Sequence, residues 1–462
     1  MNRTIFHIDV NSAFLSWSAV KRLKDDPTAV DLRTIPSVVG GDIKTRHGIV
    51  TAKSIPAKKY GIQTAEPITS ALQKCPKLVL VKSDFNTYRT YSRAFIRVLL
   101  SYSEILQQVS IDEAYLDVTD LKSLDVRKTL EEHFEDFFEN DEEGATLSPD
   151  EKSRILDEIN GSSEFAVPYP LNIAAAIRYE TRTKLGFTVN VGISSNKLLA
   201  KMASDFTKPD KTHTLFPWEI QDKMWPLEIG DLYGCGKKSA EKLRSIGIRT
   251  IGDAAKQSTG FLKSQLGDKF GDYLYASANG MGSDIVHTEQ EDAKSYSNET
   301  TLPGDITSVN FDSDLPPVVR HLSEKVSDRL KRDGVFGGTV TAQVKTSDFK
   351  RFSRQIRLSE STDSADTIYE NAMYLLGNLL SGENGLFEEG MGIRLVGVGV
   401  DNLDNGEYRQ VNLFDWMATG KEEVRREKIR EEKLKKLNEM ERLIKGKFGD
   451  DAIKKGTGNE SE

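Results

Sequence analysis

The sequence predicts an α+β protein of several domains, built around a mostly antiparallel sheet. The chain has 462 residues, more than a single hydrophobic core usually holds. In the first half, short runs in which apolar residues alternate are interspersed with stretches in which apolar residues recur at helical spacing. The same mixture returns at 294–402, after a helical stretch at 228–290. This arrangement favours α+β domains over an all-helical or an all-strand protein.

Each element of the first half follows from its apolar pattern. The strand expected at 5–10 alternates apolar residues with His7 and Asp9, and Asn11 or Ser12 can cap the helix that follows. The further elements expected in this half are a helix at 11–30, short strands and turns at 36–70, a helix at 86–106, a strand motif at 108–119, a helix at 171–185, a strand at 187–193 and a basic helix at 194–205.

The second half begins with the helical stretch, in which residues 234–238 form a glycine- and lysine-rich turn. After it we expect strands at 339–344, 354–358 and 393–400, helices at 318–332 and 365–380, a turn-rich linker at 403–409 and a highly charged helix at 421–446.

Two short acidic motifs indicate chemistry. Asp9 ends the first strand, and Asp112 and Glu113 lie in the strand motif about a hundred residues later. A carboxylate at the end of a buried strand is costly unless a cation compensates it, and hard oxygen ligands favour Mg²⁺ or Mn²⁺. Because neighbours on a regular strand point to opposite faces, Asp112 and Glu113 can reach the same ions only at a bend, such as a hairpin tip. Three such acids could hold two ions for phosphoryl transfer.

The net charge of −8 at first argues against a nucleic-acid-binding protein. Residues 131–158, however, contain 12 acidic and two basic residues, and the rest of the chain holds 61 basic and 59 acidic residues. The acidic load is therefore local, as in an insertion or an exposed flap, and other faces can be basic. Two distant cysteines exclude a disulfide framework, and neither a signal peptide nor a membrane-spanning stretch is present, so we expect a cytoplasmic protein.

These motifs, together with the segment at 191–209, resemble the Y-family translesion DNA polymerases, most closely the bacterial DNA polymerase IV (DinB-like) and UmuC-like branch. The resemblance runs from the start to about residue 400, interrupted by the acidic segment. It implies a right-hand polymerase with a palm at 1–14 and 85–225 that carries an acidic insertion at about 125–168, fingers at 15–84, a helix-hairpin-helix thumb at 226–291, an α/β little finger at 292–402, a linker with a clamp-binding motif at 403–420 and a charged helical tail at 421–462.

By this resemblance, Asp9, Asp112 and Glu113, with the main-chain carbonyl of Val10, bind two Mg²⁺ ions, for which Mn²⁺ can substitute. Primer–template DNA and dNTPs are the implied substrates. Phe14 corresponds to the aromatic residue that excludes ribonucleotides. Two cations correspond to those that bind the triphosphate: Lys58 and Lys208. Lys58 replaces the usual arginine, and Ala52 and Ile55 replace a common threonine and tyrosine, so the grip on the nucleotide departs from the family pattern.

The resemblance also implies contacts with DNA and with a partner protein. In the thumb, Gly234, Gly236, Lys237 and Lys238 are expected to bind a DNA phosphate. In the little finger, the expected DNA contacts are Lys345, Lys350, Arg351 and Arg354, although charges that protect an edge strand would look alike. Residues 410–414 resemble the peptide that binds the bacterial sliding clamp, with the contacts Gln410, Leu413 and Phe414.

The prediction is therefore a monomeric, template-directed DNA polymerase of the translesion type, with no membrane partner. An alternative is a non-catalytic factor that binds DNA and the sliding clamp at stalled forks, which the departures at Ala52 and Ile55 leave open. Another is a palm-type nucleotidyl transferase of a different kind, such as a cyclase, although a cyclase needs neither a helix-hairpin-helix turn nor a clamp motif.

Overall fold

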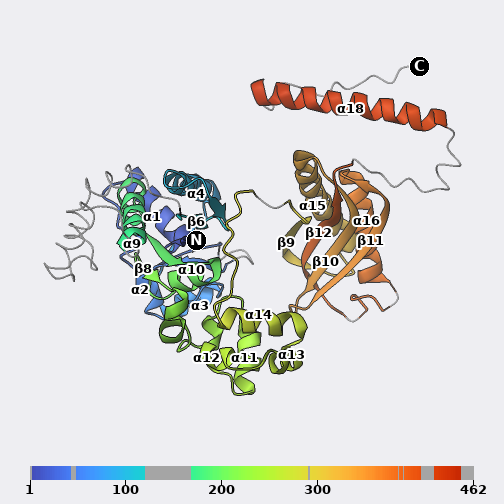
Figure 1. Ribbon diagram of the computed structural model, residues 1–462. Coiled ribbons are helices and arrows are strands. Elements are labelled where there is room, and N and C mark those ends of the chain that lie inside the picture. The colour runs from blue at the N-terminus through green and yellow to red at the C-terminus, as the bar shows by residue number, and fades with distance from the viewer. Residues whose placement is uncertain are drawn as a thin grey trace, which may run out of the picture. The chain divides into compact units, whose positions relative to one another are not determined.

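The computed structural model describes residues 3–42, 48–119, 168–289, 292–382, 384–388, 390–406 and 421–448. The chain forms two compact units, Met1–Asp292 and Ala293–Glu462, which are described separately below (Figure 1). The acidic segment 131–158 and the clamp-like motif 410–414 lie outside the described residues. No helix in the described ranges is both long and apolar enough to cross a membrane.

A five-stranded sheet forms the centre of the first unit, and its strand order is β5-β6-β1-β7-β8. The strands are β1 (Ile5–Val10), β5 (Leu106–Gln108), β6 (Glu113–Asp117), β7 (Val189–Ser194) and β8 (Thr212–Thr214). β1 pairs antiparallel with β6 on one side and with β7 on the other, β5 pairs antiparallel with β6, and β7 pairs parallel with β8. The prediction of a mostly antiparallel sheet is confirmed.

Helices cover both faces of this sheet. On one face, Phe6, Ile8 and Val10 of β1 share a core with three helices: α1 (Ala13–Asp25), α4 (Phe85–Leu100) and α9 (Pro168–Glu180), which continues into a π-helical turn at Thr181–Leu185. On the other face lies α10 (Lys197–Ser204), where Ser204 Oγ shares a 2.8 Å hydrogen bond with His7 Nδ1. All six residues of β1 are therefore buried, including its two polar side chains.

Two smaller groups of elements complete the first unit. A three-stranded sheet of order β3-β2-β4 combines β2 (Ser37–Gly40), β3 (Val50–Lys53) and β4 (Val79–Lys82) with the helices α2 (Ile55–Lys58) and α3 (Ile68–Lys74). A helical group follows the central sheet: α11 (Lys237–Ser245), α12 (Ile251–Ala255), α13 (Thr259–Leu266) and α14 (Asp268–Ala278), preceded by short turns at Pro217–Glu219, Ile220–Met224 and Ile229–Asp231. Its core includes Leu199 and Met202 of α10, so the helical group packs against the central sheet through this helix.

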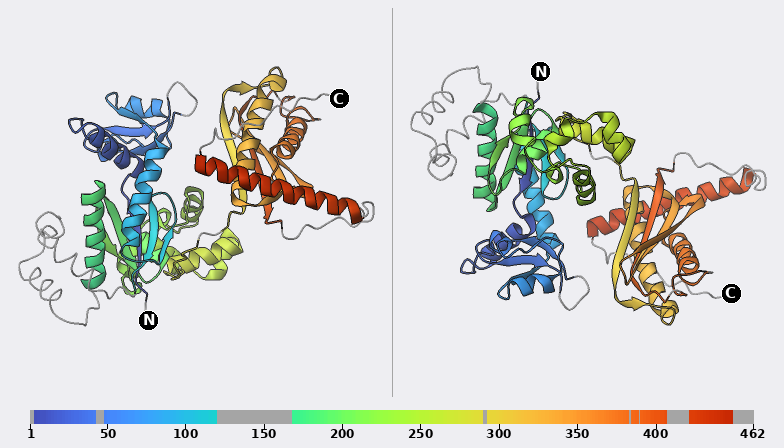
Figure 2. Two further views of the ribbon diagram at one scale, coloured as in Figure 1. Left: turned by 90° about the horizontal axis from the view of Figure 1, so that it is seen from above. Right: turned by 90° about the horizontal axis from the view of Figure 1, so that it is seen from below.

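The second unit is a four-stranded antiparallel sheet with two packed helices. The strand order is β11-β10-β12-β9, with β9 (Ser295–Ile306), β10 (Phe336–Thr346), β11 (Arg351–Thr362) and β12 (Ile393–Asp404). The apolar faces of α15 (Phe311–Asp333) and α16 (Ala365–Ser381) share one core with the sheet. The last described element, α18 (Lys421–Phe448), is drawn as one unbroken red helix in Figure 2.

Three local expectations differ from the structure. The helix expected at 11–30 is shorter, and neither expected cap operates: Ser12 has a left-handed backbone with φ 47° and makes no capping hydrogen bond. The helix expected from residue 318 begins at Phe311, so Pro316 and Pro317 lie within it. The helix expected to reach residue 106 ends at Leu100, because the chain then turns into β5.

Candidate metal centre and nucleotide site

The sheet brings the three predicted carboxylates to adjacent strands. Asp9 on β1 lies directly opposite Glu113 on β6 in the antiparallel register, although the two residues are far apart in the sequence. The main chain continues this pairing, since Val10 N–H donates a 3.0 Å hydrogen bond to the carbonyl of Asp112. Two separate acidic motifs therefore meet at one end of β1.

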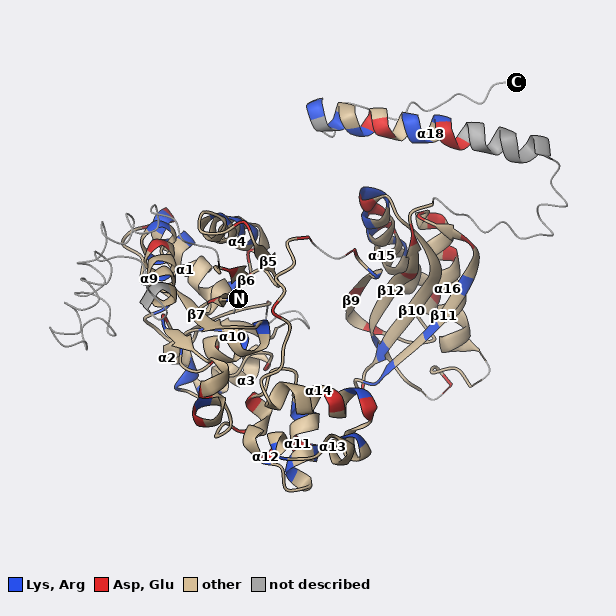
Figure 3. Ribbon diagram, in the orientation of Figure 1, with Lys and Arg blue, Asp and Glu red and all other residues tan. Residues whose placement is uncertain are grey.

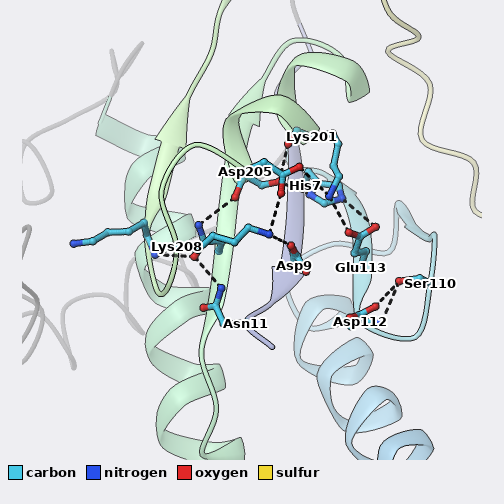
Figure 4. Close-up of polar contacts among 12 residues, drawn as sticks. His7, Asp9, Asn11, Ser110, Asp112, Glu113, Lys201, Asp205 and Lys208 are labelled. Atoms are coloured by element: carbon cyan, nitrogen blue, oxygen red, sulfur yellow. Dashed lines mark hydrogen bonds and ion pairs between the residues drawn. The ribbon is translucent and has the colours of Figure 1, made fainter. Parts of the chain in front are cut away.

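Asp112 and Glu113 lie at a bend, as expected for neighbours that serve one site. Residues 109–112 turn the chain between β5 and β6, and β6 begins at Glu113. Main-chain N–H groups of Val109 and Ser110 donate to the carbonyl of Glu113 at 3.0 and 3.3 Å. Ser110 Oγ also donates to Asp112 Oδ1 at 2.7 Å, which holds this carboxylate in the turn (Figure 4).

Two lysines hold the other two carboxylates. Lys208 Nζ forms an ion pair with Asp9, and Lys201 Nζ on α10 lies 2.8 Å from Glu113 Oε1 (Figure 4). Both ammonium groups also contact Asp205: Lys208 at 2.9 Å through Oδ1 and Lys201 at 3.3 Å through Oδ2. The predicted triphosphate ligand Lys208 is thus at the carboxylates, whereas Lys201 and Asp205 were missed by the sequence analysis. The sequence signal for these two residues was their spacing of four positions, which places a lysine and an aspartate side by side on one face of a helix.

Burial and charge set the protonation of this centre. Burial raises the pKa of Asp9, and the ammonium group of Lys208 offsets this only in part. Burial alone would lower the pKa of Lys208, but Asp9 and Asp205 outweigh it and raise the pKa. Burial would likewise lower the pKa of Lys201, but the carboxylates of Glu113 and Asp205 outweigh it and raise the pKa. Burial and then the two lysines hold the pKa of His7 well below its usual value, so this imidazole is neutral at pH 7.

The chemistry of the donor set is suited to a hard divalent cation. Within the described ranges, no three or more His, Cys, Asp or Glu side chains converge as ligands of one ion. Asp9 and Glu113 are instead paired with the ammonium groups of two lysines, and Asp112 accepts a hydrogen bond from a serine hydroxyl. Both lysines are partly or largely buried with the carboxylates. Partly buried acids that attract cations, and that present only oxygen, match the preference of Mg²⁺ and Mn²⁺.

A polar network holds the segment that carries Lys208. Asp210 N–H donates to the side-chain carbonyl of Asn11 at 2.9 Å, directly after β1. The carboxylate of Asp210 accepts hydrogen bonds from Arg178 Nε and from an Arg182 guanidinium nitrogen, each at 3.0 Å. Asn11, expected as a helix cap, thus fastens the Lys208 segment to the end of β1.

Phe14 lies at the start of α1, in a group of aromatic rings. Its ring stacks on Tyr88 with centroids 4.6 Å apart and an interplanar angle of 12°, and Phe85 meets it edge-on at 5.9 Å. Phe14 is only half-buried, whereas Tyr88 is fully buried. The ring is therefore fixed by packing while part of it remains accessible.

The other predicted site residues lie elsewhere in the fold. Lys58 is exposed at the end of α2, and the ion pairs of the three carboxylates in the described residues do not include it. Lys237 and Lys238 are exposed in the first turn of α11, after Gly236. In the second unit, Lys345 lies opposite Arg351 across β10 and β11, where Figure 3 shows basic residues on both strands.

Comparisons with known proteins agree with this architecture. Residues 8–205 match the impB/mucB/samB family, residues 293–413 match the C-terminal domain of the same family, and residues 230–282 match the DNA polymerase-iota thumb domain. The chain is 35% identical to DNA polymerase IV of Clostridium acetobutylicum over 98% of this chain and 97% of that protein. It is 30% identical to DNA polymerase IV 1 of Bacillus subtilis over 98% of this chain and 93% of that protein.

A solved structure shares the fold. The Y-family DNA polymerase chimera Dbh-Dpo4(243-245)-Dbh superimposes with a TM-score of 0.66 and 24% identity, covering 86% of this chain and 98% of the chimera. Together with the carboxylate-bearing sheet, these matches define a DNA polymerase of the Y family. Within that class the chain belongs to the impB/mucB/samB family, and its full-length relatives include DNA polymerases IV.

Proposed function

We propose that this chain is a template-directed DNA polymerase of the translesion type, which adds dNTPs to a primer 3′-hydroxyl. The observation that carries the proposal is the register of the central sheet, because it places Asp9 opposite Glu113 and next to Asp112. Family membership supports the same activity.

Asp9, Asp112 and Glu113, with the main-chain carbonyl of Val10, are the groups that would hold two Mg²⁺ ions, with Mn²⁺ as a substitute. Bound there, the ions would lower the pKa of the primer 3′-hydroxyl and neutralise charge on the triphosphate. The residues themselves supply negative charge in a partly buried site, where electrostatic interactions are stronger than in water. His7, neutral and hydrogen-bonded to Ser204 through Nδ1, has its other ring nitrogen 3.9 Å from Glu113 Oε2.

Three residues orient the incoming nucleotide in this proposal. Lys208, held near Asp9, is placed to bind the triphosphate, and Lys58 would approach it from the fingers. Lysine binds phosphate as a point charge, so the grip is less directional than with arginine. The packed ring of Phe14 would lie under the sugar and exclude a 2′-hydroxyl.

Duplex DNA would be held by the thumb and the little finger. Gly236 precedes α11, and a Cβ at this position would meet no atom within 4 Å, so a phosphate could approach the exposed main chain beside Lys237 and Lys238. Gly234, by contrast, is needed for the turn itself, because its φ of 83° lies in the left-handed region that favours glycine. A Cβ there would also lie 2.2 Å from the hydroxyl of Tyr273.

In the little finger, the cations proposed to contact DNA have different partners within the protein. Arg351 forms a 3.0 Å ion pair with Glu299, and Lys350 one of 2.9 Å with Asp348. Lys345 Nζ lies 4.9 Å from the ring centroid of Phe349. DNA phosphate would therefore compete with carboxylates at two of these cations. Arg354, three residues after Arg351 on β11, points to the other face of the sheet and donates to the carbonyl of Ser353 at 3.1 Å.

The domain assignment of the sequence analysis is part of the same proposal: a palm at 1–14 and 85–225, fingers at 15–84, a thumb at 226–291 and a little finger at 292–402. So is binding of the bacterial sliding clamp through Gln410, Leu413 and Phe414, which would raise the local concentration of a monomeric polymerase on DNA. A cytoplasmic location follows from the DNA substrate.

Primer extension tests the proposal. A labelled primer is annealed to an undamaged and to an abasic template, and extension with Mg²⁺ and dNTPs is compared between the wild type and the double variant Asp112→Ala, Glu113→Ala. We expect template-dependent extension by the wild type and none by the variant. DNA affinity, measured by fluorescence anisotropy, serves as the control for folding. A wild type that binds DNA but extends no primer would favour the non-catalytic alternative.

A further inference from the structure

Asp205 is a fourth carboxylate at the proposed metal centre, and it contacts neither Asp9 nor Glu113 directly in any described hydrogen bond. Its two oxygens face two different lysines: Oδ1 lies 2.9 Å from Lys208 Nζ, and Oδ2 lies 3.3 Å from Lys201 Nζ. Each of these lysines also pairs with one of the proposed metal ligands. Asp205 is thus the second partner of both cations that occupy the centre.

Asp205 is more exposed to solvent than the two proposed metal ligands that pair with the lysines. The side chains of Asp9 and Glu113 are 10% and 26% exposed, whereas that of Asp205 is 48% exposed at the end of α10. A lysine that leaves Asp9 or Glu113 for Asp205 therefore moves towards solvent and keeps one carboxylate partner. Without Asp205, the same movement would leave a partly buried ammonium group unpaired.

The two lysines and a divalent ion compete for the same carboxylates. A divalent cation and a lysine ammonium group repel each other more strongly in a partly buried site than in water. Lys201 and Lys208 must therefore withdraw from Glu113 and Asp9 before ions can bind there. We propose that Asp205 is a positioning residue that receives both lysines when divalent metal enters the centre. This role rests on the proposed polymerase metal site. It adds an explanation of how the lysines that pair with Asp9 and Glu113 give way to the ions.

Direct binding of Mn²⁺ tests this role without using activity. Free Mn²⁺ is measured by electron paramagnetic resonance during titration of the full chain, with neither DNA nor nucleotide present. We expect Asp205→Asn to weaken Mn²⁺ binding about threefold to tenfold, the range for losing the partner of half-exposed ion pairs. Asp25→Asn is the matched control, since Asp25 also lies four residues after its lysine, Lys21, in an exposed ion pair of 2.7 Å. It should leave Mn²⁺ binding unchanged.

A double-mutant cycle separates positioning from a general loss of negative charge. In a background with Lys201→Met and Lys208→Met, Asp205 has no lysine to receive, and Asp205→Asn should alter the Mn²⁺ dissociation constant by less than about twofold. An equal weakening in both backgrounds would overturn the proposal, because only the field of the carboxylate would then act. So would unchanged binding by Asp205→Asn in the otherwise wild-type chain.

The metal centre itself is checked in the same titration. A variant with Asp9→Asn, Asp112→Asn and Glu113→Gln should bind Mn²⁺ far more weakly than the wild type. If the wild type binds no more Mn²⁺ than this variant, the proposed metal site is refuted and the role of Asp205 falls with it. Strong binding by the wild type that is insensitive to Asp205 refutes the positioning role alone.

Discussion

Replacing Gly192 by alanine should move the helix that carries Lys201 and Asp205. Gly192 lies on β7 opposite His7, where the strand and α10 are in direct contact. A Cβ at this position would lie 2.0 Å from the carbonyl oxygen of Ala200, 2.3 Å from the main-chain nitrogen of Ser204 and 3.0 Å from its Cα. All three are main-chain atoms, which no side-chain rotation can move aside. The helix must therefore retreat by roughly 1 Å.

The cost can be estimated from this clash. Overpacking of a core by one methyl group typically destabilises a protein by about 1–3 kcal/mol. For the unit Met1–Asp292, which unfolds with a larger entropy than a small domain, that lowers the melting temperature by about 2–5 °C. Because α10 positions the two lysines at the carboxylates, a displacement of this size should also reduce the rate of primer extension about tenfold to a hundredfold.

Differential scanning calorimetry and single-nucleotide insertion measure the two effects of Gly192→Ala. Gly260→Ala is the matched control, because Gly260 lies in α13 and a Cβ there meets no atom within 4 Å. The control should melt at the wild-type temperature or slightly above it, since alanine favours a helix. If Gly192→Ala melts within about 1 °C of the wild type and keeps its insertion rate, the close contact between β7 and α10 is wrong.

Two further predictions concern the nucleotide and the clamp. Phe14→Ala should lower discrimination against ribonucleotides about tenfold to a hundredfold in single-nucleotide insertion, because the ring that blocks the 2′-hydroxyl is lost. Phe85→Ala, which removes another ring of the same aromatic group, should not, and equal effects would argue against a steric gate. Leu413→Ala with Phe414→Ala should weaken binding to the bacterial sliding clamp by more than about a hundredfold in surface plasmon resonance, while clamp-free extension stays intact. Retained clamp affinity would reject the motif.

The sequence by itself determined the class of fold and the position of the acidic motifs. Alternation of apolar residues located β1 and β7, and helical spacing located α1 and α4, because these periods are local properties of the chain. The adjacency of Asp112 and Glu113 required a bend, which the structure has immediately before β6. The family resemblance followed from the same short segments, and the comparisons confirm it.

Tertiary structure alone decided which charges meet at the site. Lys201 and Glu113 are 88 positions apart, and Lys208 and Asp9 are 199 apart, so no local pattern pairs them. The order of strands in the sheet and the packing of α10 against β1 bring them together. Asn11 gave a second example, since a residue with the signature of a helix cap instead binds the main chain of Asp210. A polar side chain takes the partner that burial offers it, and burial is set by elements that are distant in the sequence.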